Sequence, residues 1–491
     1  MLKAIASSPF LLRLTFGVLA LFLILALFFG DGLAELLAKF TLTILGYFGG
    51  YYLFLGFASV VVLIMLAVLP TGKIKLGSGP PEFSWWSWLA MLYSTGMGGG
   101  LILRAVQEPV YFFQDPPRAA DVDAKTFALE YTFFHWGLTP WAFYGLMALV
   151  VSFNLYIKKG SSLSSESLLG RGRHRLWAGI IDLFILLCTL FGVVAGVGLG
   201  SRQLMEAIRY WTGWDFLPAQ VIIPLFFICF LATLSAFLGV RKGIRLISNL
   251  NMAGASLLMV FAWTLGSFWE IIESLGLGLF TYLGDFVSLS LNLGKAQVGD
   301  QFLKDWTYFY WAFWLSWAPF TGVFIARISK GRTIRELVSG ALLIPALGTF
   351  LWFSVFGTRS FGLIEAGQVS PEAFSSIYSS ILIFFSHFSF SPISNLVVTV
   401  LVATFLITSI DSAIFVLSIF SDQGKAEPNS RIRVFWGVSI FIFTAILIWV
   451  GKEGLLESVS NLLILFALPF SLIFILLIGQ FIRYQINSTL R

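Results

Sequence analysis

The sequence predicts an all-α membrane protein that crosses a bilayer many times. Of its 491 residues, 58% are hydrophobic and 11% are charged, whereas a soluble domain carries about 25% charged residues. Twelve apolar runs are each long enough to cross a bilayer, which takes about 20 residues. Basic residues gather in alternate connections between these runs. Together, these observations indicate one polytopic domain of twelve transmembrane helices.

The twelve runs cover most of the chain, and we expect each to form a helix. They lie at residues 11–29, 43–69, 84–107, 127–157, 176–200, 219–239, 245–267, 304–327, 336–357, 393–420, 432–450 and 459–480. The first run resembles a signal peptide in its charge, but no clear small-residue cleavage site follows it. We therefore expect it to be retained, and we expect the longest runs to tilt or to extend past the lipid.

Positive charge orients the expected helices. If the N-terminus is cytoplasmic, 21 of the 31 Lys and Arg residues lie in cytoplasmic segments, nine lie in outer segments, and Arg104 lies within a run. Cytoplasmic loops of membrane proteins carry such an excess. The sequence therefore predicts a multi-pass protein of the cell inner (plasma) membrane with both termini in the cytoplasm. Because the basic residues are spread over short loops, a nucleic-acid partner is not expected.

Two of the runs carry residues that interrupt helices. The third run contains Gly96-Met97-Gly98-Gly99-Gly100, and each glycine in a helix interior costs about 1 kcal/mol relative to alanine. The eighth run contains Pro319 and Gly322. Two interrupted helices five spans apart match a transporter of two inverted repeats, in which freed carbonyls coordinate ions. Close packing of helices through small residues is the alternative explanation.

Aromatic residues cluster within two runs that we expect inside the membrane. Trp136, Trp141 and Tyr144 lie in the fourth run, and Trp314 and Trp317 lie in the eighth. Aromatic faces attract a cation without a hydrogen bond. On one continuous helix, the first three would span about 140°, at 100° per residue, so the eighth run would have to close the cage. The pattern indicates transport of an ammonium-like solute, although chance packing is the alternative in a chain with 17 Trp and 52 Phe.

Several motifs are similar to those of the betaine/choline/carnitine transporters. They are Gly96-Met97-Gly98-Gly99-Gly100 with Glu108-Pro109, Phe134-His135-Trp136-Gly137-Leu138, Lys242-Gly243-Ile244 with Ser248-Asn249, the segment from Asp305 to Glu336, and Thr408-Ser409-Ile410-Asp411-Ser412. The similarity covers roughly residues 10–480. The resemblance implies a LeuT-like fold of inverted five-helix repeats preceded by two extra helices. It also implies a homotrimer and uptake of a quaternary-ammonium or similar zwitterionic solute.

This resemblance divides the chain into a single transporter domain over residues 1–480 and a short cytoplasmic tail over 481–491. Within the domain, we expect two extra helices, a first repeat, an interfacial connecting helix and a second repeat. These parts cover residues 1–83, 84–267, 268–303 and 304–480, respectively.

The resemblance also implies a solute site. It places Trp136, Trp141, Tyr144 and Trp314 in an aromatic box, Trp317 at an adjoining position, and Gly98 and Gly100 beside the solute. Phe313 departs from the pattern, because many relatives have a second tryptophan there. The cage is therefore expected to be weaker or differently shaped than in those relatives.

A sodium site is implied as well. The matching positions are the hydroxyls of Thr408 and Ser409 and the carbonyls of Ser94, Met97 and Phe405. Gly100 stands where proton-coupled choline carriers tend to have Asp, and Asn251 stands about where sodium-independent carnitine exchangers have Arg. Both differences favour sodium as the coupling ion. For the Thr-Ser pair, hydrogen bonding to the preceding helical turn is the alternative.

Arg104 is the main departure from the family, where relatives usually have an aromatic residue. A charge within a span is a functional candidate by default. Its guanidinium group suits the carboxylate or sulfonate of a substrate. Alternatively, it pairs with Glu108 at i+4 or extends to the outer interface. The sequence leaves these three possibilities open.

The sequence therefore predicts a Na+-coupled symporter that moves a betaine-like solute by alternating access. A sodium-independent exchanger of the carnitine type is the first alternative. A membrane-embedded enzyme is less favoured, because three His, two Cys and few carboxylates within the runs provide no catalytic cluster. The expected partners are the solute, the bilayer and further copies of the chain. Sodium is expected as a coupling ion, and no cofactor is expected.

Overall fold

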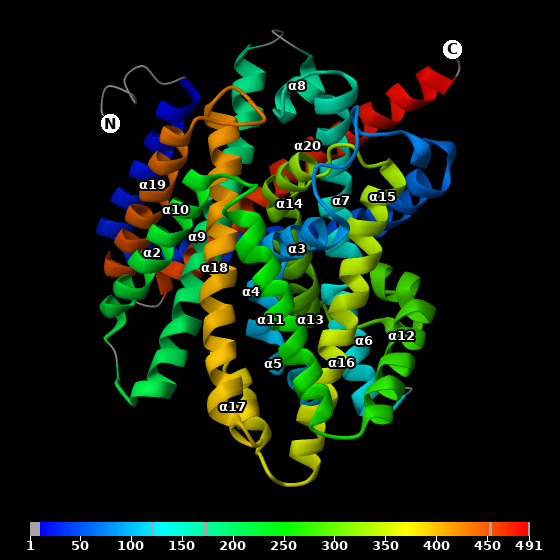
Figure 1. Ribbon diagram of the computed structural model, residues 1–491, viewed down its shortest axis with the longest axis vertical. Helices are drawn as coiled ribbons and strands as arrows, with labels where there is room; N and C mark the ends of the chain where they lie inside the picture. Colours follow the sequence, from blue (N-terminus) through cyan, green and yellow to red (C-terminus); the bar gives the residue numbers. More distant parts are fainter. Residues whose placement is uncertain (1–9, 119–121, 171–174, 216, 451–453, 490–491) are drawn as a thin grey trace.

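The computed structural model describes residues 10–118, 122–170, 175–215, 217–450 and 454–489, and these form a bundle of helices (Figure 1). Ten of the described helical stretches are long and apolar enough to cross a membrane. The prediction of an all-α membrane protein is therefore confirmed. The first turn of α2 and the last turn of α20 lie at the same end of the molecule, and α17 lies at the opposite end (Figure 1).

The ten stretches differ from the twelve predicted runs for simple reasons. Helix α2 (Phe10–Val68) contains the first two runs, and inside it only Phe29 departs from helical angles, with φ −132° and ψ 26°. The expected connection 30–42 is therefore helical too. The third run is broken into short helices, and α10 (Ile222–Leu238) in the sixth run has only 17 residues. One stretch, α12 (Phe268–Leu291), lies outside the twelve runs.

The other long helices overlap the predicted runs, but α9, α16 and α20 extend past the C-terminal ends of theirs. The long ones are α9 (Arg175–Thr212), α11 (Ile244–Thr264), α16 (Ile344–Glu365), α18 (Ser391–Ser421), α19 (Ser430–Val450) and α20 (Gly454–Thr489). The short ones are η1 (Pro70–Lys73), η2 (Phe153–Ile157), α8 (Ser164–Leu169), η3 (Pro218–Val221), η4 (Gly294–Ala296), α13 (Asp300–Phe302), η5 (Leu303–Thr307), α15 (Ile334–Val338), η6 (Ser339–Leu343), η7 (Pro371–Phe374) and α17 (Ser380–Ser386).

The glycine-rich third run is interrupted, as predicted. Helix α3 (Trp85–Gly96) ends before Met97, whose φ of −144° and ψ of −4° are not helical, and α4 (Gly98–Arg104) begins directly after it. A second break separates α4 from α5 (Gln107–Gln114). The polar backbone groups released at Met97 lie between α3 and α4, where both helices pack against α18.

The fourth run is also broken, which the sequence analysis did not predict. Helix α6 (Ala124–Trp136) and α7 (Leu138–Ser152) meet at Gly137, with φ −94° and ψ −122°. A Cβ atom at Gly137 would lie 2.4 Å from the carbonyl oxygen of Phe133, so a larger residue does not fit. Trp136 therefore ends one helix, and Trp141 belongs to the next. The 140° arc assumed one continuous helix, and that assumption was wrong.

The eighth run is not interrupted, and this prediction was wrong. Helix α14 (Tyr308–Ile328) continues through Pro319. Proline removes one backbone hydrogen bond, but membrane helices tolerate this loss where neighbouring helices pack closely. Gly322 provides that close packing, because a Cβ atom there would lie 2.5 Å from the side chain of Met147 on α7. The small-residue packing that was the alternative explanation holds for α14.

The segment 268–303, where a connecting helix is predicted, contains α12, and its interfacial role stays a prediction. Helix α12 begins after Ser267, whose hydroxyl oxygen accepts a hydrogen bond from the backbone N–H of Glu270, as N-capping serines do. It ends at Asn292, which adopts left-handed backbone angles. Along its length, α12 packs against α6, α16 and α2. It therefore contacts both the helix that carries Trp136 and the N-terminal helix.

A polar cluster, largely buried at Glu82 and Arg327 and exposed at Arg241 and Glu427, ties the start of α3 to the end of α14. Glu82 accepts hydrogen bonds of 2.9 Å from Arg327 of α14 and from Arg241 of the α10–α11 connection. Arg327 also pairs with Glu427. Burial acts to raise the pKa of Glu82, but the hydrogen bonds from the two arginines outweigh it and hold the pKa below its ordinary value.

We expect this carboxylate to make stability depend on pH. A lowered pKa means that Glu82 stabilises the fold fully above its unfolded-state pKa of about 4.3, and that this stabilisation is lost as pH falls through the folded-state pKa. Glu82→Gln should therefore lower the melting temperature at pH 7 by a few degrees and reduce its fall upon acidification. Glu365→Gln, at a half-exposed side chain paired with Lys125, should change little. Equal melting curves for the wild type and Glu82→Gln would contradict this prediction.

Candidate functional site

A cavity of about 370 Å³ lies where the broken helix α3–α4 meets α6, α9, α14, α18 and α20. Its lining residues are mostly apolar, with aromatic rings and glycines prominent. They are Thr95, Gly96, Met97, Gly98, Gly99, Gly100, Leu103, Arg104, Trp136, Val193, Gly196, Val197, Leu199, Gly200, Gln203, Phe309, Tyr310, Phe313, Trp314, Trp317, Phe320, Ile377, Val402, Leu406, Ser409, Ser460 and Asn461. The volume and the composition are typical of a small-molecule site.

Three aromatic rings form one wall of the cavity. The ring centroids of Trp136 and Trp314 are 5.1 Å apart with an interplanar angle of 69°. Tyr310, one turn before Trp314 on α14, lies 5.7 Å from Trp314 and 5.8 Å from Trp136. Both tryptophans were predicted from the sequence, but Tyr310 was not, although its i−4 spacing from Trp314 places it on the same helix face.

The polar atoms of this wall are bonded to the protein. The indole N–H of Trp136 donates to the Glu108 carboxylate at 3.0 Å, and that of Trp314 donates to the backbone carbonyl of His135 at 3.0 Å. The Tyr310 hydroxyl donates to the same Glu108 carboxylate. With their polar atoms bonded, the three rings contribute aromatic surface to the lining, and aromatic faces attract a cation that has no hydrogen to donate.

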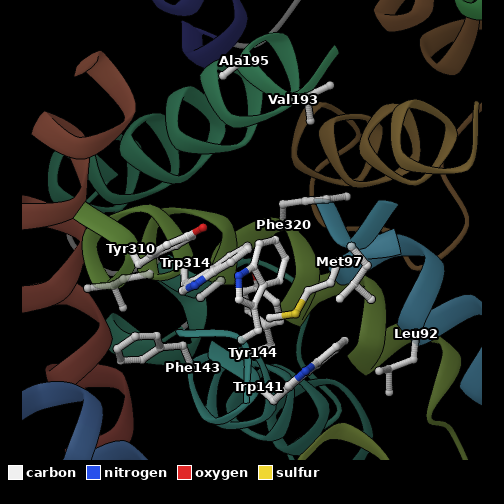
Figure 2. Packing of buried hydrophobic residues seen from close by; sticks show 14 of the residues in the cluster. Leu92, Met97, Trp141, Phe143, Tyr144, Val193, Ala195, Tyr310, Trp314 and Phe320 are labelled. Atoms are coloured by element: carbon white, nitrogen blue, oxygen red, sulfur yellow. The ribbon is translucent and has the colours of Figure 1, made fainter. Parts of the chain in front are cut away.

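Two predicted box residues lie outside this lining. Trp141 and Tyr144 are fully buried on α7, with ring centroids 5.7 Å apart, and Trp141 stacks on Tyr93. A Cβ atom at Gly96 would lie 3.1 Å from Trp141, so these rings pack directly behind the backbone of the cavity wall. Figure 2 shows Trp141 and Tyr144 on α7, near Met97. Their place in the solute box stays a prediction.

The α14 side of the cavity carries further predicted residues. Trp317 and Phe313 both line the cavity, with ring centroids 5.8 Å apart. Trp317 packs against α9, where a Cβ atom at Gly196 would lie 3.2 Å from its ring. Phe313 and Trp317 therefore continue the aromatic wall from Trp314 toward α9.

The glycines of the third run allow close approach to two rings. A Cβ atom at Gly98 would lie 2.2 Å from the ring of Phe405, and one at Gly100 would lie 2.9 Å from Trp136. At Gly99, no atom lies within 4 Å of such a Cβ position. Gly98 thus lets α4 pack on α18, and Gly100 leaves room for the Trp136 indole.

We expect Gly98→Ala to destabilise the protein and Gly99→Ala to be harmless. Forcing a methyl group into packed surroundings costs about 1–3 kcal/mol, whereas alanine in an open helical position is favourable by about 1 kcal/mol. Thermal melts of the purified variants in detergent should show a lower melting temperature for Gly98→Ala alone. Similar melting temperatures for the two variants would contradict the tight contact with Phe405.

Arg104 lines the cavity and has a different partner from the one considered in the sequence analysis. One guanidinium N–H donates to Gln107 Oε1 at 2.6 Å, and the guanidinium lies 5.7 Å from the ring centroid of Trp306. Pairing with Glu108 was wrong, because α4 ends at Arg104 and α5 begins at Gln107, so the i+4 spacing of one helix does not apply. Contact with a substrate stays a prediction.

The predicted sodium ligands lie along the junction of α3 and α18. Ser94 is fully buried, and its hydroxyl has no hydrogen-bond partner. The Thr408 hydroxyl donates to the carbonyl of Phe405 at 2.9 Å, and Asn251 donates to Thr408 at 3.3 Å. Ser409 lines the cavity.

These groups supply only oxygen atoms, which suit a hard cation. A hydrogen bond of 3.0 Å between Thr95 and Ser412 ties α3 to α18 beside them. The bond from Thr408 to Phe405 is the helical back-bonding that was the alternative. The ligand predicted at Ser94 is its backbone carbonyl, and the unpartnered Ser94 hydroxyl is a further oxygen that favours an ion there. The sodium site stays a prediction.

Comparison with known proteins extends over nearly the whole chain. Residues 10–489 match the family described as BCCT, betaine/carnitine/choline family transporter. The chain is 36% identical over 447 residues to the glycine betaine transporter OpuD of Bacillus subtilis, covering 88% of this chain and 86% of that protein. It is 35% identical to glycine betaine transporter 1 of Vibrio parahaemolyticus, with coverage of 93% and 90%. It is 32% identical to the ectoine/hydroxyectoine transporter of Virgibacillus pantothenticus, with coverage of 92% and 90%.

Solved structures show the same fold at low sequence identity. One is the substrate-bound outward-open state of a Na+-coupled sialic acid symporter, with a TM-score of 0.53, 15% identity and coverage of 86% of this chain and 85% of that one. Another is MhsT in complex with L-phenylalanine, with a TM-score of 0.51, 16% identity and coverage of 81% and 89%. The fold is therefore LeuT-like.

The aromatic cavity beside a broken helix, the LeuT-like fold and the full-length match agree with one another. They describe a transporter rather than an enzyme, and the chain belongs to the betaine/carnitine/choline family of transporters.

Proposed function

We propose that the protein is a secondary active transporter that carries a betaine-like quaternary-ammonium or other zwitterionic compatible solute, together with Na+, by alternating access. The observation that carries this proposal is the wall of Trp136, Tyr310 and Trp314, whose N–H and O–H groups all donate to the protein. A trimethylammonium group has no hydrogen to donate and is attracted to such π-faces. The relatives named as glycine betaine and ectoine transporters support the same solute class.

Sodium coupling is supported by the residues along α3 and α18. The predicted carbonyl ligand at Ser94 lies beside a buried Ser94 hydroxyl that lacks a partner, and Thr408 and Ser409 lie on the facing helix. Asn251, which donates to Thr408, is neutral, whereas an arginine in its place would supply the positive charge of an ion. A sodium-independent exchanger of the carnitine type is the second candidate, and the bond from Thr408 to Phe405 favours it.

The finer architecture is part of the proposal. We infer twelve transmembrane helices, with two extra helices over 1–83, inverted repeats over 84–267 and 304–480, and an interfacial connecting helix over 268–303. Both described chain ends lie at one end of the molecule (Figure 1), which supports an even number of crossings. The excess of basic residues in alternate connections supports cytoplasmic termini in a cell inner membrane. We also propose a homotrimer, which the mass of the detergent-solubilised protein measured by light scattering would test.

Uptake into proteoliposomes tests the proposed function. Labelled glycine betaine, ectoine, choline, carnitine and taurine should be offered with and without an inward Na+ gradient. Sodium-dependent uptake of a zwitterion is the expected result. Uptake that requires a solute inside the vesicles and does not depend on sodium would instead establish an exchanger. If none of the five solutes is taken up, the proposed solute class is contradicted.

A further inference from the structure

One buried polar side chain in the cavity is not used by the aromatic wall. Gln203 of α9 lines the cavity, is only 3% exposed, and its amide Nε2 has no hydrogen-bond partner. Leaving a buried donor unpaired costs about 1–3 kcal/mol, so buried polar groups are nearly always bonded. An unpaired amide in the lining of a binding cavity therefore indicates that a bound ligand supplies its hydrogen-bond acceptor.

The sequence around Gln203 gives its side chain access to the cavity. Gly196, Gly200 and Gln203 fall within about 60° of one another around α9, at 100° per residue, and all three line the cavity. Helical side chains lean toward the N-terminus of their helix, so Gln203 leans over the turn that holds Gly200. The side chains of Trp317 and Leu406 fill the space that Cβ atoms at Gly196 and Gly200 would take, so Gln203 shares this part of the lining with Trp317 and Leu406.

Some hydrogen-bond donors of the cavity lining are paired within the protein, and others are not. The N–H groups of Trp136 and Trp314 are bonded within the protein. Among the described lining residues, the buried donors without a partner are Gln203 Nε2 and the indole N–H of Trp317. Arg104 also lines the cavity and gives Gln107 one of its five N–H donors. The cavity thus combines aromatic rings with N–H donors that the protein leaves unpaired, and a zwitterion requires both.

We propose that Gln203 is a specificity-determining residue whose amide donates a hydrogen bond to the acid group of the transported zwitterion, in the same cavity that the Arg104 guanidinium lines. This inference rests on the proposed function and adds a discriminating contact to it. A site that hydrogen-bonds a substrate group rejects the analogue without that group, because its buried donor is then left unpaired. Gln203 would therefore favour glycine betaine over choline, which has the same ammonium group but no acid.

Two substitutions at Gln203 separate this role from a structural one. Gln203→Met keeps the length of the side chain and removes the donor, and Gln203→Glu replaces the donor with a negative charge. Binding of glycine betaine and of choline to the purified full-length protein should be measured by titration calorimetry. Gln203→Met should weaken glycine betaine binding about 10-fold or more while retaining choline binding. Gln203→Glu should reverse the preference toward choline.

The control makes the same glutamine-to-glutamate change at a residue that does not line the cavity. Gln368 is exposed in the segment after α16, and Gln368→Glu should keep the wild-type ratio of the two affinities. If Gln203→Met and Gln203→Glu both keep that ratio, the role of Gln203 is overturned while the proposed function stands. If the wild type binds no zwitterion, both proposals are overturned. Because the readout is a ratio within one protein, partial loss of folded protein does not mimic the expected result.

Discussion

Replacing Trp314 with leucine should weaken binding of a quaternary-ammonium solute about 10- to 30-fold. A cation over a desolvated indole face gains about 2 kcal/mol, and 1.4 kcal/mol corresponds to about a factor of ten in affinity. Trp314→Phe keeps an aromatic face and loses the hydrogen bond to the carbonyl of His135, so it should weaken binding less. Calorimetric titration with glycine betaine measures both variants.

The matched control is a tryptophan far from the cavity. Trp269 on α12 is 74% exposed, so Trp269→Leu removes the same side chain without touching the aromatic wall. Its affinity for glycine betaine should equal that of the wild type. If Trp314→Leu also binds glycine betaine with wild-type affinity, the π-face at Trp314 does not hold the cation.

Removing the hydroxyls of Thr408 and Ser409 should impair the response to sodium. With one oxygen ligand lost in each variant, we expect the sodium concentration for half-maximal uptake to rise about 10-fold or more, by comparison with the 10- to 100-fold effect of losing even an outer-shell partner of a metal ligand. The maximal rate at saturating sodium should fall less. Uptake by Thr408→Ala and Ser409→Ala in proteoliposomes, measured across a range of sodium concentrations, checks this expectation.

Ser418 provides the control on the same helix. It is fully buried, and its hydroxyl donates to the carbonyl of Ile414 at 2.6 Å, so Ser418→Ala removes only a back-bonded hydroxyl. The sodium dependence of this variant should match the wild type. If Thr408→Ala and Ser409→Ala also match it, their hydroxyls serve only to bond the preceding turn, and a sodium-independent exchanger becomes the better reading.

Helix breaks were predictable only where several local signals coincide. Four glycines between Gly96 and Gly100 overcome helix propensity locally, so the break at Met97 could be foreseen. Gly137 is a single glycine, and its break depends on the carbonyl of Phe133 and the ring of Phe350 nearby. At Pro319 a break was predicted but does not occur, because packing against α7 keeps α14 continuous. Both cases depend on tertiary contacts that a local pattern does not contain.

The residue types of the site could be predicted from the sequence better than the contacts that bring those residues together. Trp136 and Trp314 were correctly expected to lie together, because resemblance carries both positions. The sequence could not reveal that Glu108 accepts from Trp136 and from Tyr310, since these contacts join three helices far apart along the chain. Gln203 was missed for the same reason: its significance comes from the absence of a partner for its amide in the folded chain.

If transport is coupled to sodium, the protein uses a sodium gradient to concentrate a zwitterion in the compartment into which sodium flows. The most direct measurement is the steady-state level of labelled glycine betaine inside proteoliposomes of the wild-type protein. With an inward Na+ gradient, the internal concentration should exceed the external one, and a sodium ionophore should abolish the excess. An internal concentration that never exceeds the external one, whatever the direction of the gradient, would contradict sodium-coupled transport.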